Sequence, residues 1–198
     1  MVNASPKTTK AYDIAKQLHA GQFRKITREP YITHPVAVAE MVRDNGGNQS
    51  TIAAAYLHDV LEDVPNSYSK DNMLNDFGHE VTDLVDYVTE TKLDNNGLEL
   101  PWKQRKVAYI SRIKKAPKQA QLISLADKVN NIRSMLDGYQ TLGSAVWTNF
   151  KAPAVEQFWY YSTLNQIFIK SFGASFPLVK QLTQDCRQLA QILDQNLV

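Results

Sequence analysis

Four side chains that can bind metal or transfer protons lie within six positions of an otherwise apolar segment, AAAYLHDVLEDV (residues 53–64): His58, Asp59, Glu62 and Asp63. Buried charges cost several kcal/mol unless they are paired or bind a metal ion. An imidazole with carboxylates suits a divalent transition metal, and further carboxylates one turn away suit a general acid or base. The alternative is an ordinary solvated helix face, and this segment alone does not decide between them.

The spacing of these residues predicts where they lie on a helix from about Gln49 to Asp63. At about 100° per residue, His58 and Glu62 form one i, i+4 pair and Asp59 and Asp63 form another. The opposite arc is apolar and consists of Ala53, Ala54, Leu57, Val60 and Leu61. We therefore expect one continuous helix with two stacked polar pairs on one face.

Two further signals lie outside this segment. In SLADKVNNI, Asp127 and Asn131 are also spaced i, i+4 and project away from the apolar stripe, as the wall of a polar cleft or a solvated face would. The stripe consists of Leu122, Leu125, Val129, Ile132 and Leu136. In YITHP, His34 stands directly before a proline, where a lone histidine is usually a capping or core residue.

Composition limits the function classes. The chain has 198 residues, of which 43% are hydrophobic, and is long enough for a sizeable core in one domain. A formal net charge of +2 with dispersed basic residues argues against binding to nucleic acid or a membrane surface. There is no apolar signal segment and no run of about 18 apolar residues. The one cysteine, Cys186, is expected to be a packed thiol. We expect a soluble cytoplasmic protein without nucleic-acid or membrane partners.

Helical periodicity covers nearly the whole chain, and no strand is predicted. The predicted helices run from about Pro6 to Gly21, His34 to Asp44, Gln49 to Asp63, Lys70 to Phe77, Glu80 to Glu90, Trp102 to Lys115, Lys118 to Asp137, Pro153 to Ser171 and Phe176 to Asn196. A basic loop (22–30) and an Asn- and Gly-rich exposed loop (93–100), which could close as a lid, connect them. The aromatic cluster 158–161 is interpreted as a packing feature rather than a base-stacking platform.

The order of the three signals, a His, then His-Asp, then Asp, resembles that of the HD-domain phosphohydrolases. Five segments extend the likeness to the hydrolase domain of the RelA/SpoT family, and most closely to its single-domain members, the small alarmone hydrolases. They are HAGQFRK, PYITHPVAVAEMV, IAAAYLHDVLEDV, FGHEVTDLVDYVTETK and LISLADKVNNIR. The resemblance implies an all-α fold, a compact HD-domain bundle of about 8–10 helices around a metal cleft. The motifs occupy about residues 11–137 of one domain (1–198), and C-terminal helices occupy about 153–196.

The resemblance also implies roles for individual residues. The metal ligands would be His34, His58, Asp59 and Asp127. The metal favoured in this family is Mn²⁺, although such ligands also accept other divalent transition metals. Glu62 and Asp63 would position or deprotonate the attacking water, with Glu62 as the general base.

Four residues are implied in substrate binding. Arg24 and Lys25 would contact phosphate oxygens, Asn131 the sugar or a phosphate of the nucleotide, and Lys92 a phosphate. The remaining histidines, His19 and His79, are not assigned as ligands. Where the family usually has a Thr after the Glu-Asp pair, this chain has Val64 followed by Pro65, which changes the helix end. After about Trp147 the likeness is poor, so no guanine pocket is assigned.

The implied activity is metal-dependent hydrolysis of the 3′-pyrophosphate of (p)ppGpp, giving GDP or GTP and pyrophosphate, without synthesis. One alternative keeps the metal site and changes the substrate to a nucleoside monophosphate or NADPH. The other is a non-catalytic HD protein that binds an alarmone or a partner. The sequence does not indicate an oligomeric state.

Overall fold

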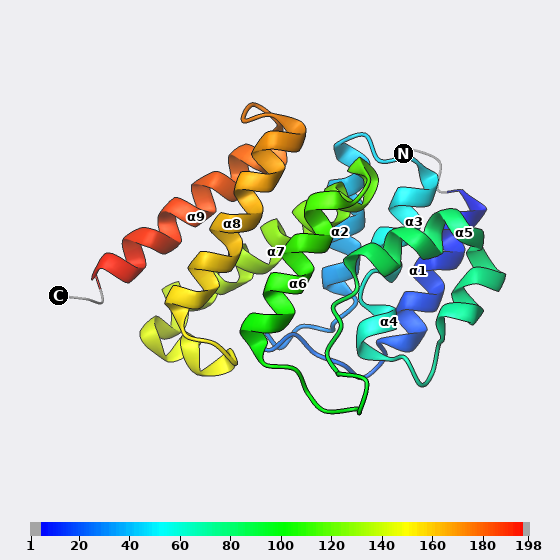
Figure 1. Cartoon of the computed structure of the whole chain (residues 1–198), viewed down its shortest axis with the longest axis horizontal. Coiled ribbons are helices and arrows are strands. Elements are labelled where there is room, and N and C mark those ends of the chain that lie inside the picture. Colours follow the sequence, from blue (N-terminus) through cyan, green and yellow to red (C-terminus); the bar gives the residue numbers. More distant parts are fainter. Residues whose placement is uncertain (1–4, 196–198) are drawn as a thin grey trace.

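Helices make up nearly all the regular structure of residues 5–195, which the computed structural model describes (Figure 1). They are α1 (Pro6–Leu18), α2 (Thr33–Asp44), α3 (Gln49–Leu57), α4 (Val60–Asp63), α5 (Lys70–Val88), α6 (Trp102–Lys115), α7 (Lys118–Leu142), the 3₁₀ segment η1 (Gly143–Asn149), α8 (Ala154–Phe172) and α9 (Pro177–Gln195). Within these residues, extended pairing is limited to two isolated bridges, Phe23 with Pro30 and Leu93 with Glu99. The expected all-α fold is confirmed.

The long helix α7 connects two packs of helices. It contacts α2, α3 and α5 on one side and α8, α9 and η1 on the other, as the arrangement in Figure 1 also shows. Its predicted apolar stripe is buried along its whole length. The helix continues to Leu142, beyond the predicted end at Asp137, and leads directly into η1. The predicted end of the last helix, at Asn196, lies outside the described residues.

The prediction of one continuous helix from Gln49 to Asp63 is wrong at its centre. Helix α3 ends at Leu57 and α4 begins at Val60, so His58 and Asp59 lie in a turn between them. On a regular helix these two neighbours would diverge by about 100°, whereas here Nε2 of His58 lies 3.2 Å from Oδ2 of Asp59. The two side chains thus converge on one point. Helix α4 ends directly before Val64 and Pro65.

The predicted break at Gly78 is confirmed. Its φ of 74° and ψ of 178° interrupt α5 in a region that favours glycine. The second arm ends at Val88 rather than at the predicted Glu90, because the N–H of Glu90 donates to the Glu62 carboxylate instead of to a helix carbonyl. The end of α5 is thus tied to the short helix α4.

A glycine brings the basic loop (22–30) against α7. A Cβ added to Gly138 would lie 2.7 Å from Cγ2 of Ile26 and 2.9 Å from Cγ2 of Val146. The loop can approach α7 this closely only because position 138 has no side chain.

Of the helices in residues 5–195, none is long and apolar enough to cross a membrane.

Candidate active site

The four predicted metal ligands come together from three parts of the chain: His34 from α2, His58 and Asp59 from the α3–α4 turn, and Asp127 from α7. The two Nε2 atoms are 3.2 Å apart. Oδ2 of Asp59 lies 3.2 Å from Nε2 of His58 and 3.5 Å from Nε2 of His34. From the other side, Oδ1 of Asp127 lies 3.3 Å from Nε2 of His34 and 3.9 Å from Nε2 of His58. All four side chains therefore face one small volume.

Hydrogen bonds on the outer ring nitrogens orient both imidazoles. Nδ1 of His34 lies 2.7 Å from the side-chain oxygen of Asn130, and Nδ1 of His58 lies 2.7 Å from the carbonyl oxygen of Ala55. Since both partners are acceptors, each Nδ1 carries a hydrogen, and in the neutral form of each ring the lone pair of Nε2 faces the centre. Asn130 was missed in the sequence, where it is one of two adjacent asparagines without a distinguishing pattern.

The donor set fits a divalent transition metal ion. Bonds of about 2.0–2.2 Å to such an ion separate neighbouring ligand atoms by about 3–4 Å, the range of the separations seen here. The outer contacts of the carboxylates also suit ligands: the Tyr31 hydroxyl donates to Oδ2 of Asp59 at 2.6 Å, and Nζ of Lys128 lies 2.5 Å from Oδ2 of Asp127. His34, His58 and Asp59 alone already form a group that could hold a metal ion.

The electrostatics of this group point to a cation at its centre. Burial disfavours a charged imidazole, but the charges of Asp59 and Asp127 outweigh burial and raise the pKa of His58 to about 9. Burial likewise works against the Asp59 carboxylate, yet the charge and hydrogen bond of His58 hold the pKa of Asp59 well below its usual range. Without a metal ion, a proton on His58 supplies the positive charge that the two carboxylates require.

The predicted acid pair lies beside this group and is held by Lys92. Nζ of Lys92 lies 3.2 Å from Oε1 of Glu62 and 3.0 Å from Oδ1 of Asp63. The other Glu62 oxygen accepts the backbone N–H of Glu90 at 2.9 Å. Burial, followed by the charge of Asp59, raises the pKa of Glu62. The structure thus places Lys92, predicted to bind phosphate, against the two acids.

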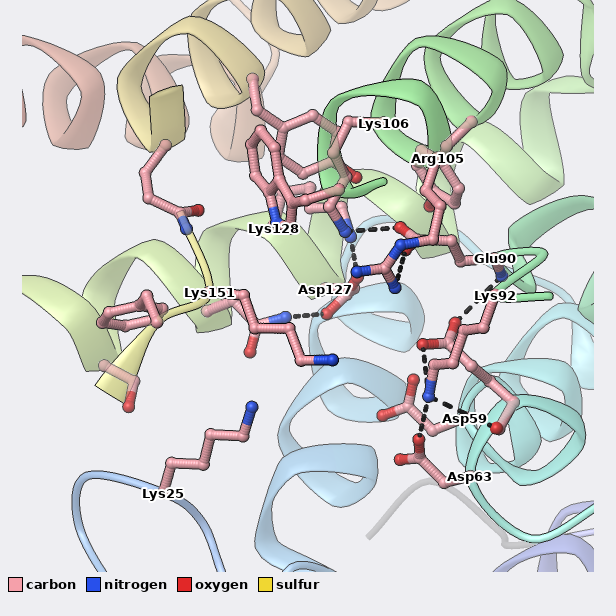
Figure 2. Close-up of a pocket in the computed structure, with 18 of the residues that line it drawn as sticks. Lys25, Asp59, Asp63, Glu90, Lys92, Arg105, Lys106, Asp127, Lys128 and Lys151 are labelled. Atoms are coloured by element: carbon pink, nitrogen blue, oxygen red, sulfur yellow. Dashed lines mark hydrogen bonds and ion pairs between the residues drawn. The ribbon is translucent and has the colours of Figure 1, made fainter. Parts of the chain in front are cut away.

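A cavity of about 440 Å³ opens over the group (Figure 2). Eight of the ten predicted site residues line it: Arg24, Lys25, Asp59, Glu62, Asp63, Lys92, Asp127 and Asn131. The other two, His34 and His58, are buried beside it. Nη2 of Arg24 donates to Oδ1 of Asn131 at 2.9 Å, which ties the basic loop to α7. The volume is typical of small-molecule sites.

Sequence reasoning missed a second set of cations on the cavity wall. Arg105 and Lys106 of α6 both pair with the Glu90 carboxylate, and Lys128 of α7 pairs with Asp127. Burial and the charge of Lys128 lower the pKa of Lys106. In the sequence, RK at 105–106 resembles any solvated basic turn of a helix, so no local signal identifies these residues. Of the aromatic cluster, Tyr160 and Tyr161 are buried, as expected of a packing feature, and both also line the cavity.

Comparison with known proteins agrees with this geometry. The chain is an all-α protein with a candidate metal centre, in which two histidines and two aspartates lie beneath a cavity. A family model described as HD domain matches residues 11–152. The chain belongs to the HD domain family.

Two similar proteins with named activities place the chain near one group within this family. A Haemophilus influenzae protein named guanosine-3′,5′-bis(diphosphate) 3′-pyrophosphohydrolase is 38% identical over 128 residues, which are 62% of this chain and 18% of that protein. The bifunctional (p)ppGpp synthase/hydrolase SpoT of Escherichia coli K12 is 38% identical over 131 residues, 63% of this chain and 17% of SpoT. The chain thus spans less than a fifth of the length of these two relatives. The expected resemblance to the RelA/SpoT family is confirmed.

Solved structures extend the likeness to nearly the whole chain. The structure of a metazoan ortholog of SpoT, described as hydrolysing ppGpp, matches with a TM-score of 0.73 and 26% identity, covering 95% of this chain and 98% of that one. The protein lmo0812 of Listeria monocytogenes EGD-e matches with a TM-score of 0.69 and 26% identity, covering 79% of this chain and 97% of that one. At 95% coverage, the first match includes most of the C-terminal helices.

Proposed function

We propose that this protein hydrolyses the 3′-pyrophosphate of (p)ppGpp, giving GDP or GTP and pyrophosphate. The activities named for the relatives support this substrate. The observation that carries the proposal is the convergence of His34, His58, Asp59 and Asp127 on one point beside a cation-lined cavity. We further propose that the chain is one HD-type domain that acts in the cytoplasm.

We propose Mn²⁺ as the metal, held by these four residues. When bound, such an ion supplies a Lewis acid that polarises a phosphoryl oxygen and lowers the pKa of water. The two neutral imidazoles and two carboxylates leave the ion near charge balance, which suits an anionic substrate. Asn130, Tyr31 and Lys128 hold the ligands from outside.

Glu62 is the proposed general base, with Asp63 as its neighbour. Its carboxylate is fixed by the Glu90 N–H and by Lys92, and its raised pKa favours proton acceptance. It takes a proton from the attacking water as oxygen bonds to the phosphorus of the 3′-diphosphate. The bond between that phosphorus and the 3′ oxygen breaks, and the 3′ oxygen leaves and takes up a proton. Pyrophosphate is the second product.

Arg24, Lys25, Asn131 and Lys92 are the proposed substrate-binding residues. Arg24 and Asn131 already hydrogen-bond each other, so a single nucleotide contact can engage the basic loop and α7 together. Lys92 bridges both acids and also lines the cavity, so the same ammonium group can orient Glu62 and meet a phosphate oxygen.

The test is to incubate Mn²⁺-loaded protein with ppGpp, deoxynucleoside monophosphates and NADPH while following pyrophosphate and phosphate separately. We expect pyrophosphate from ppGpp. Phosphate release from the other substrates with ppGpp untouched would contradict the proposal and favour the alternative phosphohydrolase.

The variant Glu62→Gln separates catalysis from simple binding. We expect turnover to fall by about 10²-fold or more, while the metal content measured by elemental analysis stays unchanged. A non-catalytic alarmone-binding protein would bind ppGpp equally with and without this substitution and would release no product in either form.

A further inference from the structure

Three buried or half-buried cations line one wall of the cavity, and the proposed function assigns none of them to the substrate. Arg105 and Lys106 lie on α6 and Lys128 on α7. The ammonium groups of both lysines lie near one ring, since Nζ of Lys106 is 4.9 Å and Nζ of Lys128 is 5.6 Å from the centroid of Tyr160. Figure 2 shows Arg105, Lys106 and Lys128 in its upper part and Lys25 at the lower left.

This wall carries more positive than negative charge. Arg105 and Lys106 share one carboxylate, that of Glu90. Lys128 contacts Oδ2 of Asp127, but the other oxygen of Asp127 faces His34 at 3.3 Å, as a metal ligand would. Arg105 also lies 3.7 Å from the exposed carboxylate of Glu99, which Lys151 of the cavity lining shares. The three cations therefore have the Glu90 carboxylate and only part of those of Glu99 and Asp127. Uncompensated buried charge is costly, and an anion in the cavity would compensate it.

The wall also has hydrogen-bond donors to spare. An ammonium group has three N–H donors, and within residues 5–195 Lys106 and Lys128 each make one hydrogen bond. The buried Nε of Arg105 and hydroxyl of Tyr160 have no hydrogen-bond partner among the described residues. The wall is thus not satisfied by the protein alone.

Its position relative to the metal site limits what it can bind. Lys128 directly follows Asp127, so one end of the wall lies next to the candidate metal, and Lys106 extends it along α6. Arg24 and Lys25 lie on another part of the cavity lining, in the basic loop. A ligand whose one phosphate sits at the metal can therefore place a second phosphate against Lys106.

We infer that Arg105, Lys106 and Lys128 form a second phosphate-binding subsite, which holds a phosphate group of the substrate other than the one attacked. The inference rests on the proposed function for the identity of the nucleotide, whereas the anion site itself does not depend on it.

The substitution Lys106→Met tests the subsite, because Lys106 touches none of the proposed metal ligands. Lys106→Arg keeps the charge, and Lys114→Met removes an exposed lysine of the same helix for which the structure records no ion pair. We expect Lys106→Met to raise the KM for ppGpp by about tenfold or more, and the two controls to stay within about threefold of the parent. Thermal unfolding of each variant verifies that the fold is retained.

Two analogues that compete with ppGpp identify the phosphate that is held: guanosine 5′-diphosphate 3′-monophosphate and guanosine 5′-monophosphate 3′-diphosphate. If Lys106 holds the outer 3′-phosphate, Lys106→Met leaves the inhibition constant of the first unchanged. If Lys106 holds the outer 5′-phosphate, the inhibition constant of the second is unchanged. An equal rise for both assigns the contact to the inner 5′-phosphate, which both retain.

Binding of inorganic pyrophosphate to metal-free protein, measured by calorimetry, separates this inference from the proposed function. We expect Lys106→Met, but not Lys114→Met, to weaken this binding by about tenfold. If the protein hydrolyses no guanosine nucleotide, the proposed function fails and this measurement alone decides the subsite. Unchanged pyrophosphate binding and unchanged KM in Lys106→Met would overturn it, as would an Arg variant that behaves like the Met variant.

Discussion

At the scale of single residues, Tyr31 offers a direct test of the candidate metal centre. Burial and the charge of Asp59 raise the pKa of Tyr31, so its hydroxyl stays protonated and donates to Oδ2 of Asp59 at 2.6 Å. We expect Tyr31→Phe to weaken Mn²⁺ binding by about tenfold, as is usual when an outer hydrogen bond to a metal ligand is lost. Competition with a fluorescent metal chelator measures this.

A second tyrosine serves as the control for this prediction. Tyr56→Phe removes the hydroxyl of a half-buried tyrosine whose ring contacts Tyr12 and for whose hydroxyl the structure records no hydrogen bond. Its Mn²⁺ affinity should equal that of the parent. Equal affinities for Tyr31→Phe and the parent would show that Asp59 does not depend on this hydrogen bond or is not a ligand.

At the scale of elements, the basic loop (22–30) depends on its close approach to α7. In Gly138→Ala the new methyl group would meet the branched side chains of Ile26 and Val146 at under 3 Å. We expect a loss of about 1–2 kcal/mol in the free energy of unfolding, because overpacking outweighs the better helix propensity of alanine. Urea denaturation measures this loss.

The same substitution also tests the link between the loop and the site. If the loop moves, Arg24 and Asn131 separate, and the KM for the substrate should rise. Gln140→Ala, at an exposed position of α7, controls for the change in helix propensity and should affect neither quantity. A Gly138→Ala protein more stable than the parent would show that the loop adjusts without cost.

At the scale of the whole molecule, the sequence predicts the helices better than their meeting points. The apolar stripe of α7 and the break at Gly78 are readable because each follows from local periodicity or backbone freedom. The break between α3 and α4 is not readable, since a buried alanine-rich run resembles a continuous helix and His58 in the turn contacts His34 and Asp127, which are distant in the sequence. Arg105 and Lys106 are missed because their shared carboxylate partner, Glu90, follows another helix, α5, and only the tertiary fold brings it to α6.

The candidate metal site also joins elements that are far apart in the sequence. Its ligands come from α2, the α3–α4 turn and α7, between residues 34 and 127. An unfolded chain cannot present them together, so metal binding stabilises the folded state by RT ln(1 + [M]/Kd), about 2.7 kcal/mol at a metal concentration 100 times Kd. We expect the Tm of chelator-treated protein to rise with Mn²⁺ until the site saturates.

A variant without the site distinguishes this linkage from non-specific effects of salt. Asp59→Asn removes a ligand charge while keeping the size of the side chain, and its Tm should respond to Mn²⁺ no more than to the same ionic strength of NaCl. Without metal, this variant should be less stable than the parent near pH 7, because the amide lacks the charge that pairs with protonated His58. A Tm rise with Mn²⁺ as large in Asp59→Asn as in the parent would place the stabilising ion elsewhere on the molecule.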